Sequence, residues 1–147
     1  NRGYYYTPHL VKKIGDKEAL EEYKTKHYTK IDPKHYDVVI EGMQRVINGG
    51  GGQIGTGFRS QLDSIIVCGK TGTSQNPHGE DHSVFIAFAP KENPTIAVSV
   101  YVENGGQGAR AASSIAGLMI EKYLYGGPTN KRRQWIEDYV LRNDFIY

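Results

Sequence analysis

The sequence predicts a mixed α/β fold of the α+β type, in which an antiparallel sheet is flanked by helices. Three apolar runs of strand length occur from the middle of the chain onward, at Leu62 to Cys68, Val84 to Ala89 and Thr95 to Glu103. Only Pro90 to Pro94 separate the last two runs, and so short a connection fits a hairpin better than a crossover. Segments with helical spacing of apolar residues stand before and after these runs.

The first predicted helix begins after Asp32, a capping residue, with Pro33 in the first helical position. It ends at Asn48-Gly49 and is followed by a glycine-rich loop from Gly49 to Phe58. Its expected apolar face consists of Val39, Met43, Val46 and Ile47.

Two further helices are predicted after the strands. The run from Ala109 to Tyr125 is stopped by Gly126-Gly127-Pro128, and its small residues suit close packing on a sheet. Its expected inner face is Ala112, Ile115, Ala116, Met119, Ile120 and Tyr123. The segment from Asn130 to Asn143 is expected to dock on the body through Trp135, Ile136, Tyr139 and Val140.

The N-terminal residues show no clean period, and we interpret Tyr4 to Tyr28 as a connector that includes a short extended piece. Asn1-Arg2-Gly3 resembles the frayed end and glycine cap of a helix, and no methionine precedes it. We therefore expect the chain to be a piece of a longer protein. Its 147 residues are enough for one core, so one globular unit is predicted.

Composition excludes little beyond nucleic-acid binding. The net charge is +2, with 18 basic and 16 acidic residues spread along the chain, so no basic stripe predicts a nucleic-acid partner. The single cysteine, Cys68, has no second cysteine for a disulfide or a metal pair. No run approaches the ~20 apolar residues of a membrane span.

The most informative motif is Lys70-Thr71-Gly72-Thr73, directly after the first apolar run. On a strand, Thr71 and Thr73 project from one face, and Gly72 leaves room for a close approach by a backbone or a ligand. One cation, two hydroxyls and exposed amides can bind an anionic, peptide-like ligand. An ordinary surface lysine is the alternative interpretation of Lys70.

Other motifs are weaker. Gly50 to Gly55 fits the glycine spacing of a dinucleotide loop, but a helix precedes it where that loop needs a strand. A phosphate loop ending at Gly69 would need glycine where Ser64 stands. His78 and His82 have metal-ligand spacing only on a helix, which Pro77 and Gly79 disfavour, so neither a metal nor a cofactor is predicted.

The sequence shows no motif that would supply a catalytic nucleophile. No serine of the chain has lysine three residues later, and no other serine, cysteine or threonine stands in a recognisable arrangement with a base. Ser74-Gln75-Asn76 spells serine-any-asparagine, but it continues directly from Thr73 and cannot face that strand across a cleft.

Taken in order, these motifs resemble the C-terminal half of the transpeptidase domain of class B penicillin-binding proteins, most closely the elongation type, penicillin-binding protein 2. The resemblance runs from Asn1-Arg2-Gly3 and Thr7-Pro8-His9 through Lys70-Thr71-Gly72-Thr73 and Phe85 to Pro90, and ends with Val102 to Gly106 before a helix. It assigns residues 1–125 to that domain and leaves 126–147 as a C-terminal helical tail.

The resemblance implies a serine β-lactamase-like fold and roles for single residues. Lys70 and Thr73 would be catalytic, Lys70 by positive potential in the cleft and Thr73 through a backbone amide that stabilises the oxyanion. Lys70, Thr71, Gly72 and Thr73 would bind substrate, with the two threonines holding its carboxylate. The serine would lie outside this chain, which alone should be inactive.

The resemblance also implies substrates, partners and a location. The ligands would be peptidoglycan stem peptides and β-lactams. The partners would be a membrane glycan polymerase and rod-shape scaffold proteins. The location would be the periplasmic face of the bacterial inner membrane, with the membrane anchor absent from this chain. An exposed sheet edge and self-association are expected of the isolated piece.

Two alternatives stay open. One is a D,D-carboxypeptidase or β-lactamase, in which water accepts the acyl group. The glycine loop and Glu103 to Gly106 favour a transpeptidase instead. The other is a penicillin-binding sensor module without turnover, which the Lys-Thr-Gly half of the site does not distinguish from an enzyme.

Overall fold

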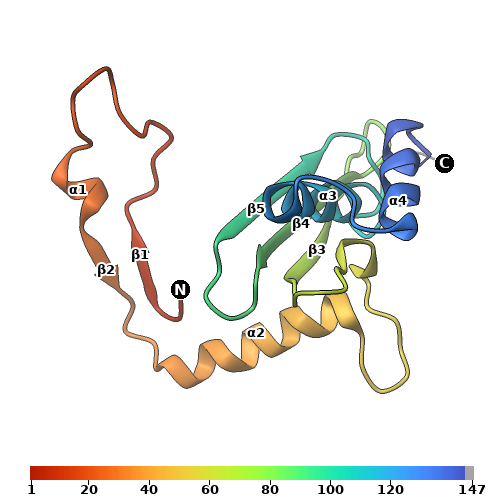
Figure 1. The fold of residues 1–147 in the computed structure, drawn as a ribbon, viewed down its shortest axis with the longest axis horizontal. Helices are drawn as coiled ribbons and strands as arrows, with labels where there is room; N and C mark the ends of the chain where they lie inside the picture. Colours follow the sequence, from red (N-terminus) through yellow and green to blue (C-terminus); the bar gives the residue numbers. More distant parts are fainter. Residues whose placement is uncertain (145–147) are drawn as a thin grey trace. The chain divides into compact units, whose positions relative to one another are not determined.

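The computed structural model describes residues 1–144. The chain divides into two compact units, Asn1–Val39 and Ile40–Tyr147 (Figure 1), where one unit was predicted. The elements in order are β1 (Tyr4–Tyr6), α1 (Glu21–Lys24), β2 (Lys26–Tyr28), α2 (Pro33–Asn48), the 3₁₀ helix η1 (Phe58–Ser60), β3 (Cys68–Ser74), β4 (His82–Ala89), β5 (Ile96–Val102), α3 (Ala111–Tyr125) and α4 (Lys131–Leu141).

The first unit is more structured than the predicted connector. Strands β1 and β2 form a two-stranded antiparallel sheet in which Tyr4 lies opposite Tyr28. The Lys26 ammonium lies over the Tyr4 ring, 3.9 Å from its centroid, and Tyr5 stacks on His27. No residue of this unit is fully buried, so ring and cation contacts hold the ribbon in place of a core.

Helix α2 has the predicted bounds, and most of its predicted apolar face is confirmed, since Ile47 is buried and Met43 and Val46 are partly buried. Val39 was wrongly assigned to this face: it is 59% exposed, and Ile40 is buried instead. Spacing alone could not separate neighbouring helical faces, because Val39 and Ile40 are equally apolar and differ by only about 100° around the axis.

The second unit contains a three-stranded antiparallel sheet in the order β3-β4-β5. The predicted hairpin is confirmed, with Ala89 opposite Ile96 across the turn. Within the described residues, β3 and β5 each pair only with β4, so both leave an open edge.

The first predicted strand was placed too early. Residues 62–67 form no regular element, although Leu62 and Val67 are buried, and the strand begins at Cys68. The apolar run reaches the core as irregular chain, while the more polar Lys70–Ser74 segment takes its hydrogen-bond partners from β4.

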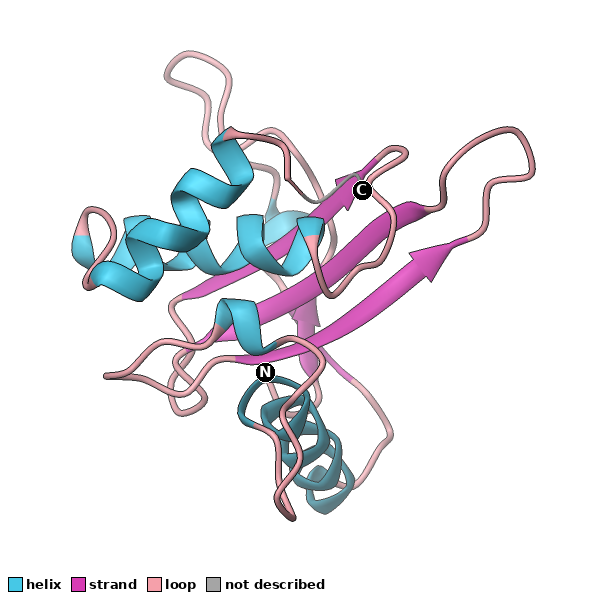
Figure 2. Cartoon of the chain, turned by 90° about the vertical axis from the view of Figure 1, so that its right-hand side faces the viewer, coloured by secondary structure: helices cyan, strands magenta, loops and turns pink. Residues whose placement is uncertain are grey.

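Helix α3 covers one face of the sheet (Figure 2). Alternate residues of β4, Ser83, Phe85, Ala87 and Ala89, are buried on that side, and they meet Ala112, Ala116 and Ile120 of α3. Met119 and Tyr123, predicted on the inner face of α3, are 50% and 62% exposed. The opposite face of β4 carries Ile86, which is 47% exposed.

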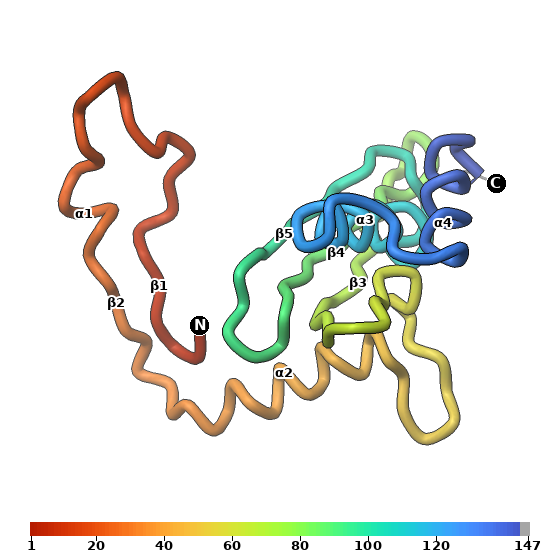
Figure 3. The backbone as a smooth tube through the Cα atoms, viewed as in Figure 1, coloured from red at the N-terminus to blue at the C-terminus, as the bar shows by residue number. Residues whose placement is uncertain are grey.

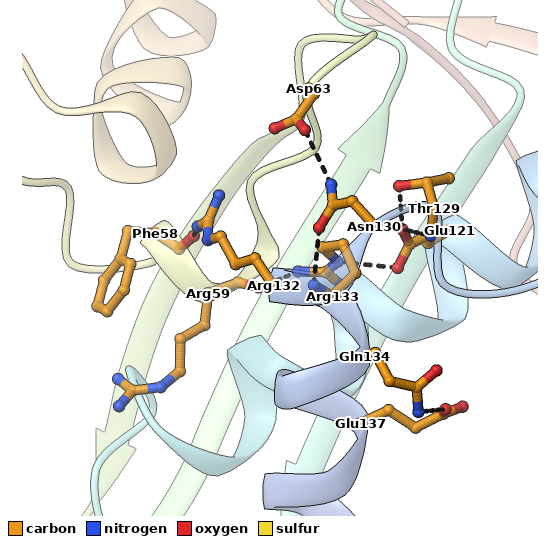
Figure 4. A network of polar contacts seen from close by, with 10 residues as sticks. All are labelled: Phe58, Arg59, Asp63, Glu121, Thr129, Asn130, Arg132, Arg133, Gln134 and Glu137. Atoms are coloured by element: carbon orange, nitrogen blue, oxygen red, sulfur yellow. Dashed lines mark hydrogen bonds and ion pairs between the residues drawn. The ribbon is translucent and has the colours of Figure 1, made fainter.

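Helix α4 packs on α3 (Figure 3), and a buried ion pair joins the two helices (Figure 4). The Arg133 Nε donates to Glu121 Oε2 at 2.8 Å, and both side chains are 1% exposed. Thr129 donates to the other Glu121 oxygen from its amide at 2.9 Å and its hydroxyl at 2.7 Å. The Asn130 side chain caps α4 by accepting from Arg133 N at 2.9 Å.

The same arginine reaches the 3₁₀ helix. Arg133 Nη1 donates to the Arg59 carbonyl, and Arg132 Nη2 donates to the Phe58 carbonyl at 2.7 Å. Gly117 of α3 permits this approach, because a Cβ there would lie 2.6 Å from Ser60 Cα and 3.0 Å from Arg133 Nη2. Helix α4 therefore holds η1 through side-chain bonds to its backbone.

A surface contact joins α2 to the β4–β5 turn within the second unit. Lys91 Nζ donates to Glu41 and, at 2.7 Å, to Gln44 Oε1. The hydrogen bond to Glu41 raises the pKa of the Lys91 ammonium above its usual value. Over residues 1–144, none of the helices is both long and apolar enough to cross a membrane.

Candidate functional site

Strand β3 carries the predicted site residues. Its register against β4 places Lys70 opposite Ile86, Thr71 opposite Phe85, Gly72 opposite Val84 and Thr73 opposite Ser83. Lys70 and Thr73 are exposed, and Thr71 and Gly72 are partly buried. The motif thus lies on an outer strand of the described sheet, where a ligand can reach it.

The lysine and the hydroxyls leave β3 on opposite faces. Directly opposed residues of an antiparallel pair project to the same face, so Thr71 and Thr73 share the α3 side with Phe85 and Ser83. Lys70 starts on the other side, with Ile86. Its Nζ donates to the carbonyl of the following residue, Thr71, at 2.7 Å.

The hydroxyls of the motif have long contacts with two loops. Thr71 Oγ1 lies 3.5 Å from Thr56 Oγ1 at the end of the glycine-rich loop, and Gly108 N lies 3.5 Å from Thr73 Oγ1. Both distances are at the outer limit of a hydrogen bond, so either hydroxyl can form a shorter bond with a ligand.

The close approach predicted at Gly72 involves a second glycine. A Cβ on Gly72 would make only ordinary contact, with Val84 Cβ at 3.4 Å. A Cβ on Gly108, in the loop between β5 and α3, would lie 2.1 Å from the Gly72 carbonyl oxygen and 2.5 Å from that of Val84. Only glycine at 108 permits this loop to lie against the motif.

The loops at this end of the sheet are tied together. Asn76 Nδ2 donates to Asn104 Oδ1 at 2.9 Å, and Asp81 Oδ1 accepts from Asn76 N at 3.1 Å. Gly106 N donates to the Asp81 carbonyl at 2.7 Å. Asn76, the asparagine of the serine-any-asparagine triplet, thus joins the β3–β4 loop to the loop before α3.

His82 belongs to this group of loop contacts. It lies opposite Ser74, four residues along the ladder from the Lys70–Ile86 pair, or about 13 Å at ~3.3 Å per residue. Its Nδ1 accepts from Asn104 N at 3.0 Å, and its ring lies 5.3 Å from that of Tyr101. Residues 1–144 contain no group of three or more histidine, cysteine or acidic side chains that could hold a metal.

The glycine-rich loop follows α2 and precedes η1, so it is not the strand–loop–helix arrangement of a dinucleotide site. Gly50 and Gln53 exchange backbone hydrogen bonds of 3.1 Å at its tip. A cavity of about 700 Å³ between this loop and α2 is lined by Arg45, Gln53, Ile54 and several glycines.

Sequence reasoning missed three residues beside the motif: Thr56, Ser83 and Gly108. The Asn104-Gly105-Gly106 segment was singled out as a motif, and the glycines continuing to Gly108 were the available signal of a close backbone approach. Ser83 gave no signal, since its importance depends on which strand lies beside it.

The arrangement can bind an anion. It presents the side chain of Lys70 and two threonine hydroxyls on an outer strand, and groups of these types can donate hydrogen bonds to a carboxylate. An antiparallel sheet with α3 on one face and this motif on β3 is the architecture of the serine β-lactamase-like class, and the solved structures that the chain resembles are transpeptidase domains of that class.

The chain belongs to the penicillin-binding protein transpeptidase family, because residues 1–122 match the model of the penicillin binding protein transpeptidase domain. It is 33% identical to the peptidoglycan D,D-transpeptidase MrdA of Haemophilus influenzae over 159 aligned positions, which include 95% of this chain and 23% of the relative. The chain therefore spans about a quarter of that relative's length.

Solved structures agree with this assignment. The crystal structure of Pseudomonas aeruginosa PBP2 in complex with WCK 5153 superposes with a TM-score of 0.70 at 32% identity, over 85% of this chain and 27% of that one. PBP2 from Helicobacter pylori, solved in complex with MreC, gives a TM-score of 0.57 at 25% identity, over 74% of this chain and 21% of that one.

Proposed function

We propose that this chain is part of a peptidoglycan D,D-transpeptidase of the penicillin-binding protein 2 type, which crosslinks stem peptides during cell-wall elongation and binds β-lactams. The observation that carries the proposal is the Lys70–Thr73 motif on an outer strand, in a chain that belongs to this family. The D,D-transpeptidase relative supports it.

In the proposed reaction, a serine of the whole protein attacks the carbonyl of the D-alanyl-D-alanine bond. The last D-alanine leaves, and the acyl group passes from the serine oxygen to a neighbouring amine. Lys70 supplies positive potential, Thr71 and Thr73 bind the terminal carboxylate, and the Thr73 amide donates to the oxyanion. No serine-x-x-lysine occurs in these 147 residues, so the chain alone is proposed to be inactive.

The domain, location and partners are part of the same proposal. Residues 1–125 form the C-terminal part of the transpeptidase domain, with 126–147 as its helical tail. The protein acts at the periplasmic face of the inner membrane, with a membrane glycan polymerase and rod-shape scaffold proteins. The solved complex of H. pylori PBP2 with MreC supports the scaffold partner.

The proposal predicts a covalent penicillin adduct. Incubating the full-length protein with benzylpenicillin should give one adduct by intact-mass analysis, and peptide mapping should place it on a serine N-terminal to Asn1. A protein that stays unmodified would favour a degenerate binding module. Product analysis with stem peptides then separates crosslinking from hydrolysis, and hydrolysis alone would favour the carboxypeptidase or β-lactamase alternative.

Removing the Thr73 hydroxyl should weaken carboxylate binding selectively. Thr73→Val keeps the shape of the side chain, so acylation by benzylpenicillin should slow roughly fivefold, the loss of about one hydrogen bond. Acylation by the methyl ester of benzylpenicillin should change much less. Equal losses with the acid and the ester would mean that the substitution disturbs packing instead.

A further inference from the structure

We propose that Ser83 is a positioning residue, which acts through Gly108 to orient the Thr73 hydroxyl toward the carboxylate of a bound ligand. The inference rests on the proposed function and extends it to two residues outside the Lys70–Thr73 motif.

Ser83 joins β4 to both ends of the turn before α3. Its side chain is fully buried, its Oγ donates to the Gln107 carbonyl at 3.0 Å, and the same oxygen accepts from Ala112 N at 2.9 Å. One hydroxyl thereby uses its single proton and one lone pair. The Ala112 amide belongs to the first turn of α3, where helix amides lack partners within the helix.

The turn held by Ser83 places Gly108 on the motif. Arg110 N donates to the Gln107 carbonyl at 2.9 Å, and Ser113 N donates to the Gly108 carbonyl at 3.1 Å, so the turn is also bonded within itself. The near contact between Gly108 and the Gly72 carbonyl leaves no space for a side chain. A shift of Gln107 would therefore move Gly108 relative to Thr73.

The contact with Gly108 determines whether the Thr73 hydroxyl donates or accepts a hydrogen bond there. Its amide can only donate, so in the 3.5 Å contact Thr73 Oγ1 is the acceptor. The Thr73 proton then remains available for a ligand, and Thr73 is exposed. Because the contact is long, it contributes little to stability, and its consequence for the site is that the Thr73 proton points away from the Gly108 amide. An oriented donor suits a carboxylate, which only accepts hydrogen bonds.

The competing explanation is that Ser83 serves only the fold. Ser114 provides a matched control, because it is also fully buried and lies in the first turn of α3. Its hydroxyl donates to the carbonyl of Arg110, the N-cap residue of that helix, at 2.6 Å, and makes no bond to Gln107 or Gly108. A loss of stability alone should therefore appear in Ser83→Ala and Ser114→Ala alike.

The experiment measures acylation rates of the full-length protein with benzylpenicillin and with its methyl ester, which lacks the free carboxylate. Ser83→Ala should lower the acid-to-ester rate ratio about threefold, whereas Ser114→Ala should leave the ratio unchanged. In the Thr73→Val background, Ser83→Ala should have no further effect on the ratio, because the hydroxyl through which it acts is gone.

Three results would overturn the inference while the proposed function stands. They are an unchanged ratio in Ser83→Ala, an equal fall in the ratio in Ser114→Ala, or a full threefold fall when Ser83→Ala is added to Thr73→Val. If Ser83→Ala does not fold, Ser83→Cys keeps a side chain of similar size with weak hydrogen bonding, and the same fall in the ratio is expected. A wild-type protein that forms no adduct would overturn both proposals.

Discussion

Replacing Arg133 with alanine should lower the free energy of unfolding by about 3–5 kcal/mol, the effect of breaking a buried ion pair on one side. Arg133 and Glu121 are both 1% exposed, and the substitution would leave the Glu121 carboxylate buried with only Thr129 as its partner. The Arg59 carbonyl would also lose its donor. We therefore expect α4 to separate from α3 and η1.

Hydrogen exchange on the full-length protein is the appropriate measurement, because it reports the opening of α4 and the end of α3 separately from the rest. Arg142→Ala is the matched control, at the C-terminal cap of the same helix. It removes a bond to Asp144 in which the two side chains are 58% and 47% exposed, so protection should hardly change. Equal loss of protection in the two variants would show that the burial of Arg133 is unimportant.

A double replacement tests whether the unpaired, buried Glu121 carboxylate causes the expected loss of protection in Arg133→Ala. Arg133→Met with Glu121→Leu removes both charges and fills the space with apolar side chains, so it should recover most of the protection lost in Arg133→Ala. If the double variant is as unprotected as Arg133→Ala, the loss comes from the bonds to the η1 backbone and not from an unpaired buried carboxylate.

Local signals were enough to predict the three longer helices, α2, α3 and α4, whereas the short helices α1 and η1 were missed. Asp32-Pro33 and Asn48-Gly49 give α2 its observed limits, and Gly126 ends α3 as expected. The buried faces of these helices were harder to predict. Trp135 of α4 was expected to dock but is 51% exposed, because the helix packs through Arg133, Ile136 and Tyr139. Burying an arginine depends on a partner twelve residues away, which periodicity does not reveal.

Strand pairing was predicted only where one short turn fixed it. The β4–β5 hairpin follows from Pro90 to Pro94, whereas β1 and β2 pair across about twenty residues that gave no sign of it. Strand β3 was placed six residues too early, since the apolar run Leu62 to Val67 looks more like a strand than the polar segment that actually pairs.

In the candidate site, too, the local motif could be predicted from the sequence and its tertiary contacts could not. Lys70, Thr71, Gly72 and Thr73 are contiguous and could be chosen from the sequence. Their neighbours could not, because Thr56 and Gly108 reach the motif from loops 15 and 35 residues away along the chain. A local pattern identifies the groups proposed to touch a ligand, while the groups proposed to orient them depend on the tertiary fold.

Replacing Lys70 with alanine should slow acylation of the full-length protein by benzylpenicillin at least about tenfold, with the fold intact. Lys70 is exposed and leaves β3 on the face opposite Thr71 and Thr73, so its removal creates no cavity and leaves both hydroxyls in place. What is lost is the positive charge near the Thr71 carbonyl, where Nζ now lies. A carboxylate and a developing oxyanion are both stabilised by that charge.

Lys122 gives the matched control for Lys70. Its Nζ likewise donates to a backbone carbonyl, that of Gly126 at 2.6 Å, but it lies at the far end of α3 from the loop that contacts β3. Lys122→Ala should therefore leave the acylation rate unchanged, and Lys70→Arg should retain more activity than Lys70→Ala because it keeps the charge. If Lys70→Ala and Lys122→Ala acylate equally fast, Lys70 is an ordinary surface lysine. The carboxylate would then be bound by the threonine hydroxyls and the backbone of β3 alone.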